Sequence, residues 1–127
     1  MRQPDCVFCQ KTDLVLENDL AKAFWDLHPV RKGHLLIVPK DHYATYFDVP
    51  VKTRQAMDDL LFQAKAFLDQ RYQPAGYNVG INVNPAGGQT VMHAHIHLIP
   101  RYVGDVKDPR GGIRKMIPAA VRRHFTK

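Results

Sequence analysis

The segment that decides the fold of this chain is Gly87-Gly-Gln-Thr-Val-Met-His-Ala-His-Ile-His-Leu-Ile-Pro-Arg101. Polar and apolar side chains alternate through its centre, which predicts a β-strand over residues 90–99. His93, His95 and His97 would then share one face of that strand, because successive side chains point to opposite faces. Three imidazoles on one face pack no better than Val or Thr would, so we interpret this row as functional.

Two kinds of chemistry fit the histidine row. All three imidazoles could bind one metal ion, or one of them could act as a nucleophile while its neighbours fix its tautomer and stabilise charge. The residues just before the row favour the nucleophile. Gly87 and Gly88 would let backbone N–H groups approach phosphate oxygens closely, while Gln89 and Thr90 add an amide and a hydroxyl.

The remaining elements follow from the hydrophobic pattern on either side of this segment. Residues 20–27 and 34–38 favour strands, and the Pro- and Gly-containing turn between them predicts an antiparallel pair. Between Pro50 and Arg71 the apolar residues recur at helical spacing. A further strand is predicted over 77–83 and a short helix from about Pro118. We therefore expect an α+β domain with about five antiparallel strands, one long helix and a short C-terminal helix.

The composition limits the classes of protein and of partner. The chain has 127 residues, of which 45% are hydrophobic, and this length suits one domain with its own core. Its net charge of +6 favours an anionic partner such as a nucleotide, a phosphate ester or a nucleic acid. Many basic residues lie in 101–127, but aromatic residues are not interleaved there as a base-stacking platform, so nucleic acid is not the favoured partner.

The sequence also carries an expectation about location. No apolar run approaches the roughly 20 residues that a membrane-spanning helix needs. Residues 1–10 are polar and lack the apolar core of a signal peptide. We therefore expect a soluble, cytoplasmic protein without membrane contact.

The two cysteines, Cys6 and Cys9, have C-x-x-C spacing. In an intracellular protein this spacing indicates metal binding or redox chemistry more than a structural disulfide. A thioredoxin-like redox motif would follow a strand and open a helix, whereas this pair lies near the start of the chain. We favour zinc, with a redox role or incidental cysteines as alternatives.

Residues 88–99 resemble the H-φ-H-φ-H-φ-φ signature of the histidine triad (HIT) family, in which φ is an apolar residue. Further segments resemble the family in the same order along the chain: Cys6–Cys9, Ala23–Asp26, Gly33–His42 and Asn82. One departure is Asn84, because many members have glycine there. The resemblance implies one HIT domain over 1–127, with a zinc knuckle in residues 1–12 and a basic loop and helix in 101–127.

The resemblance also implies a role for each matching residue. His95 would be the nucleophile that attacks the α-phosphorus of a nucleotide. His97 and Gln89 would contact the phosphate and assist catalysis, with Asn82 and Thr90 nearby.

Two further roles concern the ribose and the metal. Asp26 would hydrogen-bond the ribose hydroxyls, and His34 would support the triad from the adjacent strand. The implied ligands of a structural zinc are Cys6, Cys9, His42 and His93. Two thiolates and two imidazoles form a closed tetrahedral site of the structural type, and no organic cofactor is expected.

The expected function is hydrolysis of a purine nucleotide derivative at the α-phosphate through a nucleotidyl-histidine intermediate. Gln89-Thr90 before the triad and Pro100-Arg101 after it resemble the dinucleoside polyphosphate hydrolases of the family. The alternatives are a purine nucleoside phosphoramidase and a zinc-stabilised nucleotide-binding module without turnover. A homodimer is expected as well, because one long helix leaves a sheet edge and an apolar helix face to be covered.

Overall fold

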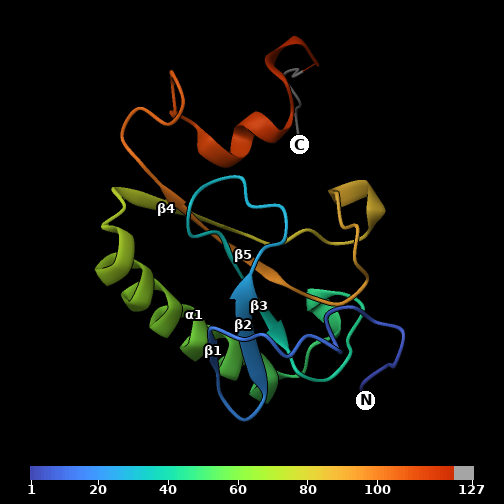
Figure 1. The fold of residues 1–127 in the computed structure, drawn as a ribbon. Helices are drawn as coiled ribbons and strands as arrows, with labels where there is room; N and C mark the ends of the chain where they lie inside the picture. The colour runs from blue at the N-terminus through green and yellow to red at the C-terminus, as the bar shows by residue number, and fades with distance from the viewer. Residues whose placement is uncertain (122–127) are drawn as a thin grey trace.

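Figure 1 shows the fold in a computed structural model, which describes residues 1–121. Five strands form one sheet in the order β1-β2-β3-β5-β4, and every neighbouring pair is antiparallel. The strands are β1 (Leu16–Glu17), β2 (Ala21–Trp25), β3 (Leu35–Pro39), β4 (Gly76–Gly80) and β5 (Ile96–Arg101). The expected α+β fold with five antiparallel strands and one long helix is confirmed.

Helix α1 (Val51–Tyr72) covers one face of the sheet. Its buried side chains recur every three or four residues, and they are Thr53, Met57, Leu60, Ala64 and Leu68. They pack in one apolar cluster with strand side chains such as Leu35, Ile37 and Leu98. Burial of each large side chain stabilises the fold by about 1.5–3 kcal/mol. The helix predicted over 50–71 is therefore confirmed.

The N-terminal segment covers the other face of the same strands. Phe24, Leu36 and Val38 form a second buried cluster, against which Phe8 and Leu14 pack. Strand β3 is consequently buried on both faces, which explains its uninterrupted apolar sequence.

Strand register places the third triad histidine on this second face. Leu36 lies opposite Phe24 on β2 and opposite His97 on β5. Side chains directly opposite each other on antiparallel strands share a face. His97 therefore lies on the face that the N-terminal segment partly covers, away from α1.

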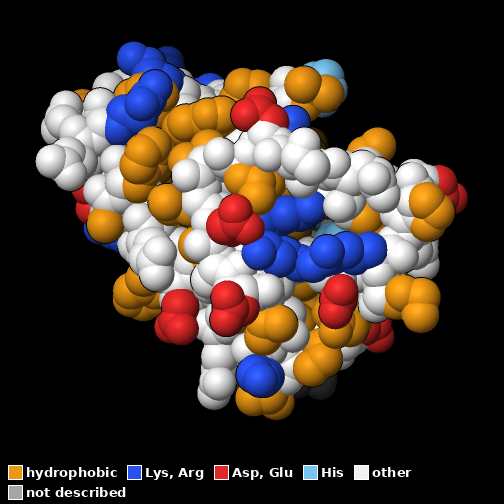
Figure 2. Space-filling view, turned by 60° about the horizontal axis from the view of Figure 1, so that its bottom comes forward, with side chains coloured by type: hydrophobic (Ala, Val, Ile, Leu, Met, Phe, Trp, Pro, Cys, Tyr) orange, Lys and Arg blue, Asp and Glu red, His pale blue; other side chains and the backbone are white. Residues whose placement is uncertain are grey.

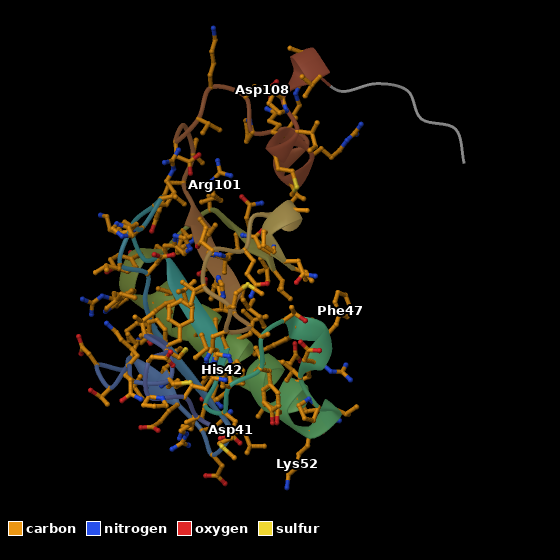
Figure 3. The ribbon with its side chains drawn as sticks, turned by 90° about the vertical axis from the view of Figure 1, so that its right-hand side faces the viewer. Asp41, His42, Phe47, Lys52, Arg101 and Asp108 are labelled. Atoms are coloured by element: carbon orange, nitrogen blue, oxygen red, sulfur yellow. The ribbon has the colours of Figure 1, made fainter. Side chains whose placement is uncertain are left out.

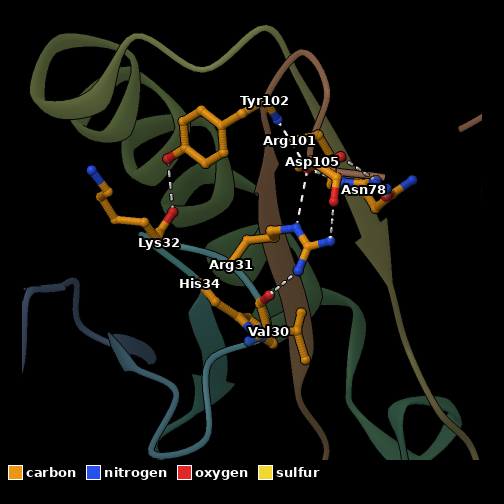
Figure 4. Close-up of polar contacts among 8 residues, drawn as sticks. All are labelled: Val30, Arg31, Lys32, His34, Asn78, Arg101, Tyr102 and Asp105. Carbon is orange, nitrogen blue, oxygen red and sulfur yellow. Dashed lines mark hydrogen bonds and ion pairs between the residues drawn. The ribbon is translucent and has the colours of Figure 1, made fainter. Parts of the chain in front are cut away.

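The turn between β2 and β3 is fixed by a glycine and by an ionic network. Gly33 has φ +89°, and a Cβ there would lie 3.0 Å from the Tyr72 ring, so a side chain would be strained and crowded. The Arg31 guanidinium forms an ion pair of 3.2 Å with Asp105 (Figure 4). Arg101 also binds Asp105, with two hydrogen bonds of 2.8 Å. The chain that follows β5 is thereby tied to this turn.

The strand that carries the histidines is shorter than expected. A strand was predicted over 90–99, but β5 begins at Ile96. Strand β3 ends at Pro39, and the Ala94 N–H donates instead to the Tyr43 carbonyl at 2.7 Å. The expectation that all three histidines lie on one strand face is therefore wrong, because only the third lies in a strand.

Other differences concern short elements. The 3-10 helices are η1 (Tyr46–Asp48), η2 (Pro85–Gly87), η3 (Gly112–Met116) and η4 (Ala119–Val121). The helix expected from about Pro118 corresponds to η4, and the remainder of that prediction lies outside the described residues. The strand predicted over 77–83 ends at Gly80. Within residues 1–121, no helix is both long enough and apolar enough to cross a membrane.

Candidate functional site

A cavity of about 360 Å³ opens on the sheet face opposite α1. Side chains from β2, the N-terminal segment, the loop before β5 and β5 itself line it. The predicted site residues among them are Asp26, Asn82, Thr90, His95 and His97, and Gly88 also contributes. Apolar side chains form the opposite wall: Val7, Phe8, Phe24, Leu27 and Leu36. A cavity with one polar end and one apolar wall suits a ligand that joins a charged group to a flat ring.

The loop between β4 and β5 forms the polar end of this cavity. Asn84 has φ +64° and Gly88 has φ +94°. With ψ 164°, Asn84 adopts a backbone conformation that essentially only glycine populates without strain, as the family pattern at this position suggests. The Asn84 carbonyl accepts from the N–H groups of Gly87 at 3.0 Å and Gln89 at 3.1 Å. These bonds make a tight, preformed turn beside the histidines.

Gln89 is buried beneath this loop, with 4% of its surface exposed. Its Nε2 donates to the carbonyls of Ala44 at 2.7 Å and Val91 at 3.0 Å. Its Oε1 accepts from the Asn84 N–H at 2.8 Å. The side chain does not line the cavity. A direct contact between its amide and a phosphate would require the exchange of one of these hydrogen bonds.

His95 has one ring nitrogen occupied and one available. Its Nδ1 lies 2.8 Å from the His93 carbonyl, and only an N–H can pair with that oxygen. The hydrogen is therefore on Nδ1, and Nε2 carries a lone pair. The ring packs edge-to-face against Phe8 with a centroid distance of 5.2 Å. His95 is thus a buried imidazole, 6% exposed, held in the tautomer that a nucleophile requires.

His97 is held in a defined tautomer by its neighbour on β3. The Val30 N–H donates to Nδ1 of His34 at 3.2 Å, so His34 carries its hydrogen on Nε2. That nitrogen lies 2.9 Å from Nδ1 of His97 and donates to it. His97 therefore carries its own hydrogen on Nε2, where it can donate to an anionic oxygen in the cavity.

Both imidazoles of this pair are held neutral by their surroundings. Burial lowers the pKa of His97 to about 4, and the nearby His95 and His34 reinforce the shift. Burial also lowers the pKa of His34, although the Asp26 carboxylate partly opposes it. At neutral pH the pair consists of two uncharged rings joined by a hydrogen bond.

Asp26 lies beside the same pair. Its Oδ2 is 3.3 Å from Nε2 of His34, and its Oδ1 accepts from the His28 N–H at 2.9 Å. The side chains of Asp26, His34 and His97 bring three ligand-type atoms within 4.8 Å of one another. Because the His34 nitrogen that faces the others carries a hydrogen, this group is better described as a hydrogen-bonded network than as a metal site.

A second cluster lies at the other end of the histidine segment. One ligand atom from each of four residues lies within 4.8 Å of the others, and these are Cys6, Cys9, His42 and His93. Nδ1 of His93 is 3.3 Å from the Cys6 sulfur and 3.5 Å from the Cys9 sulfur. Tetrahedral zinc with its usual bond lengths would place such sulfur and nitrogen atoms about 3.6 Å apart.

The surroundings of the cluster also suit a metal. Nε2 of His93 donates to the Pro39 carbonyl at 2.8 Å, which leaves Nδ1 free as a ligand. The Gln3 N–H donates to the Cys9 sulfur at 3.3 Å, and the Cys9 N–H donates to the Cys6 sulfur at 3.4 Å. Figure 3 shows that His42 lies within the body of the molecule, far from the C-terminal region that carries Asp108. The four predicted ligands therefore fit a structural zinc.

The cluster and the cavity share one short segment. Phe8 stands between the two cysteines and packs against His93 at 5.9 Å and His95 at 5.2 Å, measured between ring centroids. It also meets Phe24 edge-to-face at 5.4 Å. The C-x-x-C segment thus holds the apolar wall of the cavity in place.

These features agree with the comparison of the chain with known proteins. A family model of the HIT domain matches residues 8–104. The chain belongs to the HIT domain family. A 16.1 kDa HIT-like protein of Mycoplasma pneumoniae is 37% identical, with 80% of this chain and 75% of that protein covered.

Two further members of the HIT family extend the comparison. Adenylylsulfatase HINT3 of Arabidopsis thaliana is 34% identical, with 97% of this chain and 71% of that protein covered. The crystal structure of a Zn-bound histidine triad family protein from Mycobacterium smegmatis has a TM-score of 0.73 and 30% identity. That likeness covers 80% of this chain and 78% of the other. The HIT family therefore includes enzymes and at least one metal-bound member.

The apolar wall of the cavity was not predicted from the sequence. Val7, Phe8 and Leu27 are distant from the triad in sequence and belong to no polar motif. One signal was present for Phe8, because a residue between two cysteines of a predicted metal site would have its position fixed by them. Nothing comparable marks Leu27, which is 81% exposed at the cavity mouth.

Proposed function

We propose that this protein is a nucleotidyl hydrolase that cleaves dinucleoside polyphosphates at the α-phosphate and releases a nucleoside monophosphate. The observation that carries the proposal is the tautomer of His95. Its Nδ1–H donates to the His93 carbonyl, so its Nε2 lone pair is free in a cavity that is polar at one end and apolar at the other. Membership of the HIT family, which includes an adenylylsulfatase, supports chemistry at a nucleotide phosphate.

Substrate placement follows from the two ends of the cavity. The purine base would pack on the apolar wall, between Phe8 and Leu36. The ribose hydroxyls would reach the Asp26 carboxylate, and the α-phosphate would lie beside Gly88 and Thr90 of the loop. Asn82 lines the same polar end and would hold the phosphate from the opposite side of that loop.

In the first step, Nε2 of His95 attacks the α-phosphorus. A nitrogen–phosphorus bond forms while the bond to the bridging oxygen breaks, and the rest of the substrate leaves with that oxygen. His97 donates its Nε2–H to a phosphate oxygen and stabilises the charge that develops there. The hydrogen bond from His34 holds His97 in this donor tautomer throughout.

In the second step, a water molecule attacks the phosphorus of the nucleotidyl-histidine. The oxygen of water bonds to phosphorus, the nitrogen–phosphorus bond breaks, and His95 regains its lone pair. The water proton passes to solvent or to the product. Two displacements at one phosphorus atom replace a single difficult hydrolysis.

Gln89 contributes indirectly in this proposal. Its three hydrogen bonds join the loop to residues on either side, and so keep the turn at Gly88 and the Thr90 that follows it in position beside the phosphate. Catalysis would depend on this order because a misplaced donor stabilises the transition state poorly.

We further propose that the four-ligand cluster holds one structural zinc. A zinc ion there supplies folding free energy and fixes the start of the histidine segment. It takes no part in the reaction steps above. Because the site needs two reduced thiols, a reducing cytoplasmic compartment suits it.

We also propose a homodimer. Strand β4 is an edge of the sheet, and Val79 on it is 43% exposed. Tyr77 of the same strand donates to Asp69 on α1 at 2.6 Å, so strand and helix lie side by side there. On α1, Phe62 is 69% exposed. Pairing of two such edges would cover both features, and sedimentation of a single species of about 14.5 kDa at micromolar concentration would contradict it.

A substrate panel with product identification tests the proposed activity. Diadenosine tetraphosphate, an adenosine phosphoramidate, adenosine 5′-phosphosulfate and adenylated DNA would each be incubated with the purified protein. We expect the fastest release of AMP from diadenosine tetraphosphate. Faster cleavage of the phosphoramidate would assign the protein to the phosphoramidases, and binding without turnover of any compound would make it a nucleotide-binding module.

A further inference from the structure

A second cavity, of about 350 Å³, lies behind the C-x-x-C segment. We call it the basic pocket. Besides Cys9 and Leu14, its lining consists of six polar or charged residues: Arg2, Lys11, Thr12, Glu17, Lys22 and Lys40. Four of these six are cationic and one is acidic. Figure 2 shows lysine and arginine side chains gathered in adjoining rows across the middle of this face.

Lys22 is the unusual member of the basic pocket. It is 5% exposed, and its ammonium group donates to the carbonyls of Cys9 at 3.2 Å and Lys11 at 2.9 Å. An ammonium group has three hydrogens, so one remains for another acceptor. Among residues 1–121, no carboxylate lies within ion-pair distance of it. The Cys9 and Cys6 thiolates would favour this cation, but a zinc ion bound between them would neutralise their charge. An anion in the pocket would then reduce the cost of burying the Lys22 ammonium group.

The other cations are only partly neutralised. Lys40 forms an ion pair of 2.7 Å with Glu17, which uses the single carboxylate of the pocket. Arg2 lies 3.7 Å from Asp41, in a pair whose side chains are about half exposed or more. Exposed pairs of this kind contribute little. Lys11, like Lys22, has no carboxylate partner in the described part of the chain.

We propose that the basic pocket binds a phosphate group. A dianion matches the excess of positive charge, and its tetrahedral oxygens can accept from groups that converge from several directions. Arg2 offers a planar fork of donors, the lysines offer point charges, and Thr12 adds a hydroxyl. This inference does not rest on the proposed hydrolysis, because the pocket lies outside the catalytic cavity. The phosphate could be inorganic phosphate or part of an organic phosphate ester.

The pocket also touches the wall of the catalytic cavity. Lys11 lines both cavities, and its ammonium group lies 5.6 Å from the centroid of the Phe24 ring. Lys22 binds the backbone on both sides of residue 10, directly after the C-x-x-C segment. A phosphate in the pocket would therefore brace the segment that carries Phe8.

Phosphate titration of the full-length, zinc-loaded protein followed by amide NMR tests the proposal. Inorganic phosphate and glycerol 3-phosphate would be added separately, with chloride used to hold ionic strength constant. Saturable shifts are expected at the amides of Thr12 and Lys22. Shifts confined to Asn82 and Thr90, which report the catalytic cavity, or shifts that never saturate, would overturn the proposal. The ligand with the lower Kd indicates whether the source is free or esterified phosphate.

A matched pair of charge variants completes the test. Lys40→Gln should raise the Kd for phosphate at Thr12 about fivefold or more, because it removes one cation and leaves Glu17 unpaired. Lys52→Gln makes the same change of charge on α1, outside the pocket, and should change the Kd by about twofold or less. Equal weakening in the two variants would mean that only net charge is sensed, and would contradict a defined site. Lys40 is partly exposed and Lys52 is exposed, so neither variant disturbs the core.

Discussion

The two ends of one short segment are suited to different chemistry in this protein. At the first end, His93 faces two cysteine sulfurs with a free Nδ1 lone pair, and a zinc ion fits among them. At the other end, four residues further on, His97 has its Nδ1 occupied by a hydrogen bond from His34. Both imidazoles are uncharged, because burial lowers the pKa of each to about 4.

The two ends differ in which ring nitrogen of the histidine already has a hydrogen-bond partner, and in whether that partner accepts or donates. A backbone carbonyl accepts from Nε2 of His93, so the opposite nitrogen has a lone pair available for a metal ion. An N–H donor pairs with Nδ1 of His97, so the opposite nitrogen becomes a donor. His95, between them, donates through Nδ1 and keeps a nucleophilic Nε2. Three identical side chains thus present different ring nitrogens to their surroundings, which suits each to a different role.

The largest effect, on kcat, is expected from replacing the middle histidine, His95. His95→Asn should lower kcat for diadenosine tetraphosphate by about 10⁴-fold or more, since the amide cannot attack phosphorus. Nucleotide affinity and thermal stability should stay close to those of the wild type. Acid-quenched wild-type protein should carry a base-stable, acid-labile nucleotidyl adduct that this variant lacks. Substantial activity in His95→Asn would show that another histidine is the nucleophile.

The next largest effect, on zinc content and thermal stability, is expected at the cluster of Cys6, Cys9, His42 and His93. Cys9→Ser should abolish stoichiometric zinc and lower the Tm by about 10 °C or more, because zinc binding contributes directly to folding. A chelator should lower the Tm of the wild type toward that of the variant and leave the variant itself unchanged. Metal analysis that finds no zinc in the purified wild type, together with a Tm indifferent to chelator, would rule out this role.

A smaller effect is expected on the pH dependence of stability. The pKa of His97 is about 4 in the folded protein and ordinarily about 6.5, so the unfolded chain binds the proton more readily. Stability is therefore present above about pH 6.5 and is lost as the pH falls toward 4. Between pH 7 and pH 4.5, urea unfolding should show a decline in free energy that is about 1–2 kcal/mol smaller in His97→Gln than in the wild type. Parallel declines in the two proteins would show that His97 is not held neutral by burial.

The smallest effect is expected at the edge of the hydrogen-bonded network. Asp26→Asn should raise KM about tenfold, which corresponds to about 1.4 kcal/mol, and change kcat by only a few-fold. The asparagine keeps an oxygen for the His28 N–H but loses the charge that favours ribose hydroxyls. If kcat fell instead while KM stayed constant, Asp26 would act through His34 and not on the substrate.

The sequence predicted much of the fold because its patterns are local. The helix over 50–71 and the pairing of 20–27 with 34–38 depend on the spacing of apolar residues and on a turn between them, and both were confirmed. The strand of histidines was predicted to start six residues too early, since the alternating pattern continues beyond the point where a partner strand exists. Strand β1 was missed because two residues carry too little pattern.

The candidate site shows the same division. Its polar residues could be named from the motif, whereas Leu36 shows no signal of its own and Phe8 is marked only by its place between two cysteines. The burial of Gln89 could not be predicted, because one of its three hydrogen bonds joins it to Ala44, which is 45 residues away.

By itself, the sequence determined which side chains are available: four metal-type ligands, a row of three histidines, a glycine turn and the apolar periods that build a sheet and a helix. Only the tertiary structure decided what each histidine does. A hydrogen bond from His34 or to the Pro39 carbonyl depends on strands that meet through folding, and that bond fixes the ring nitrogen that keeps its lone pair. Composition cannot carry that information, since a proton on an imidazole follows its neighbours in space and not its neighbours in the chain.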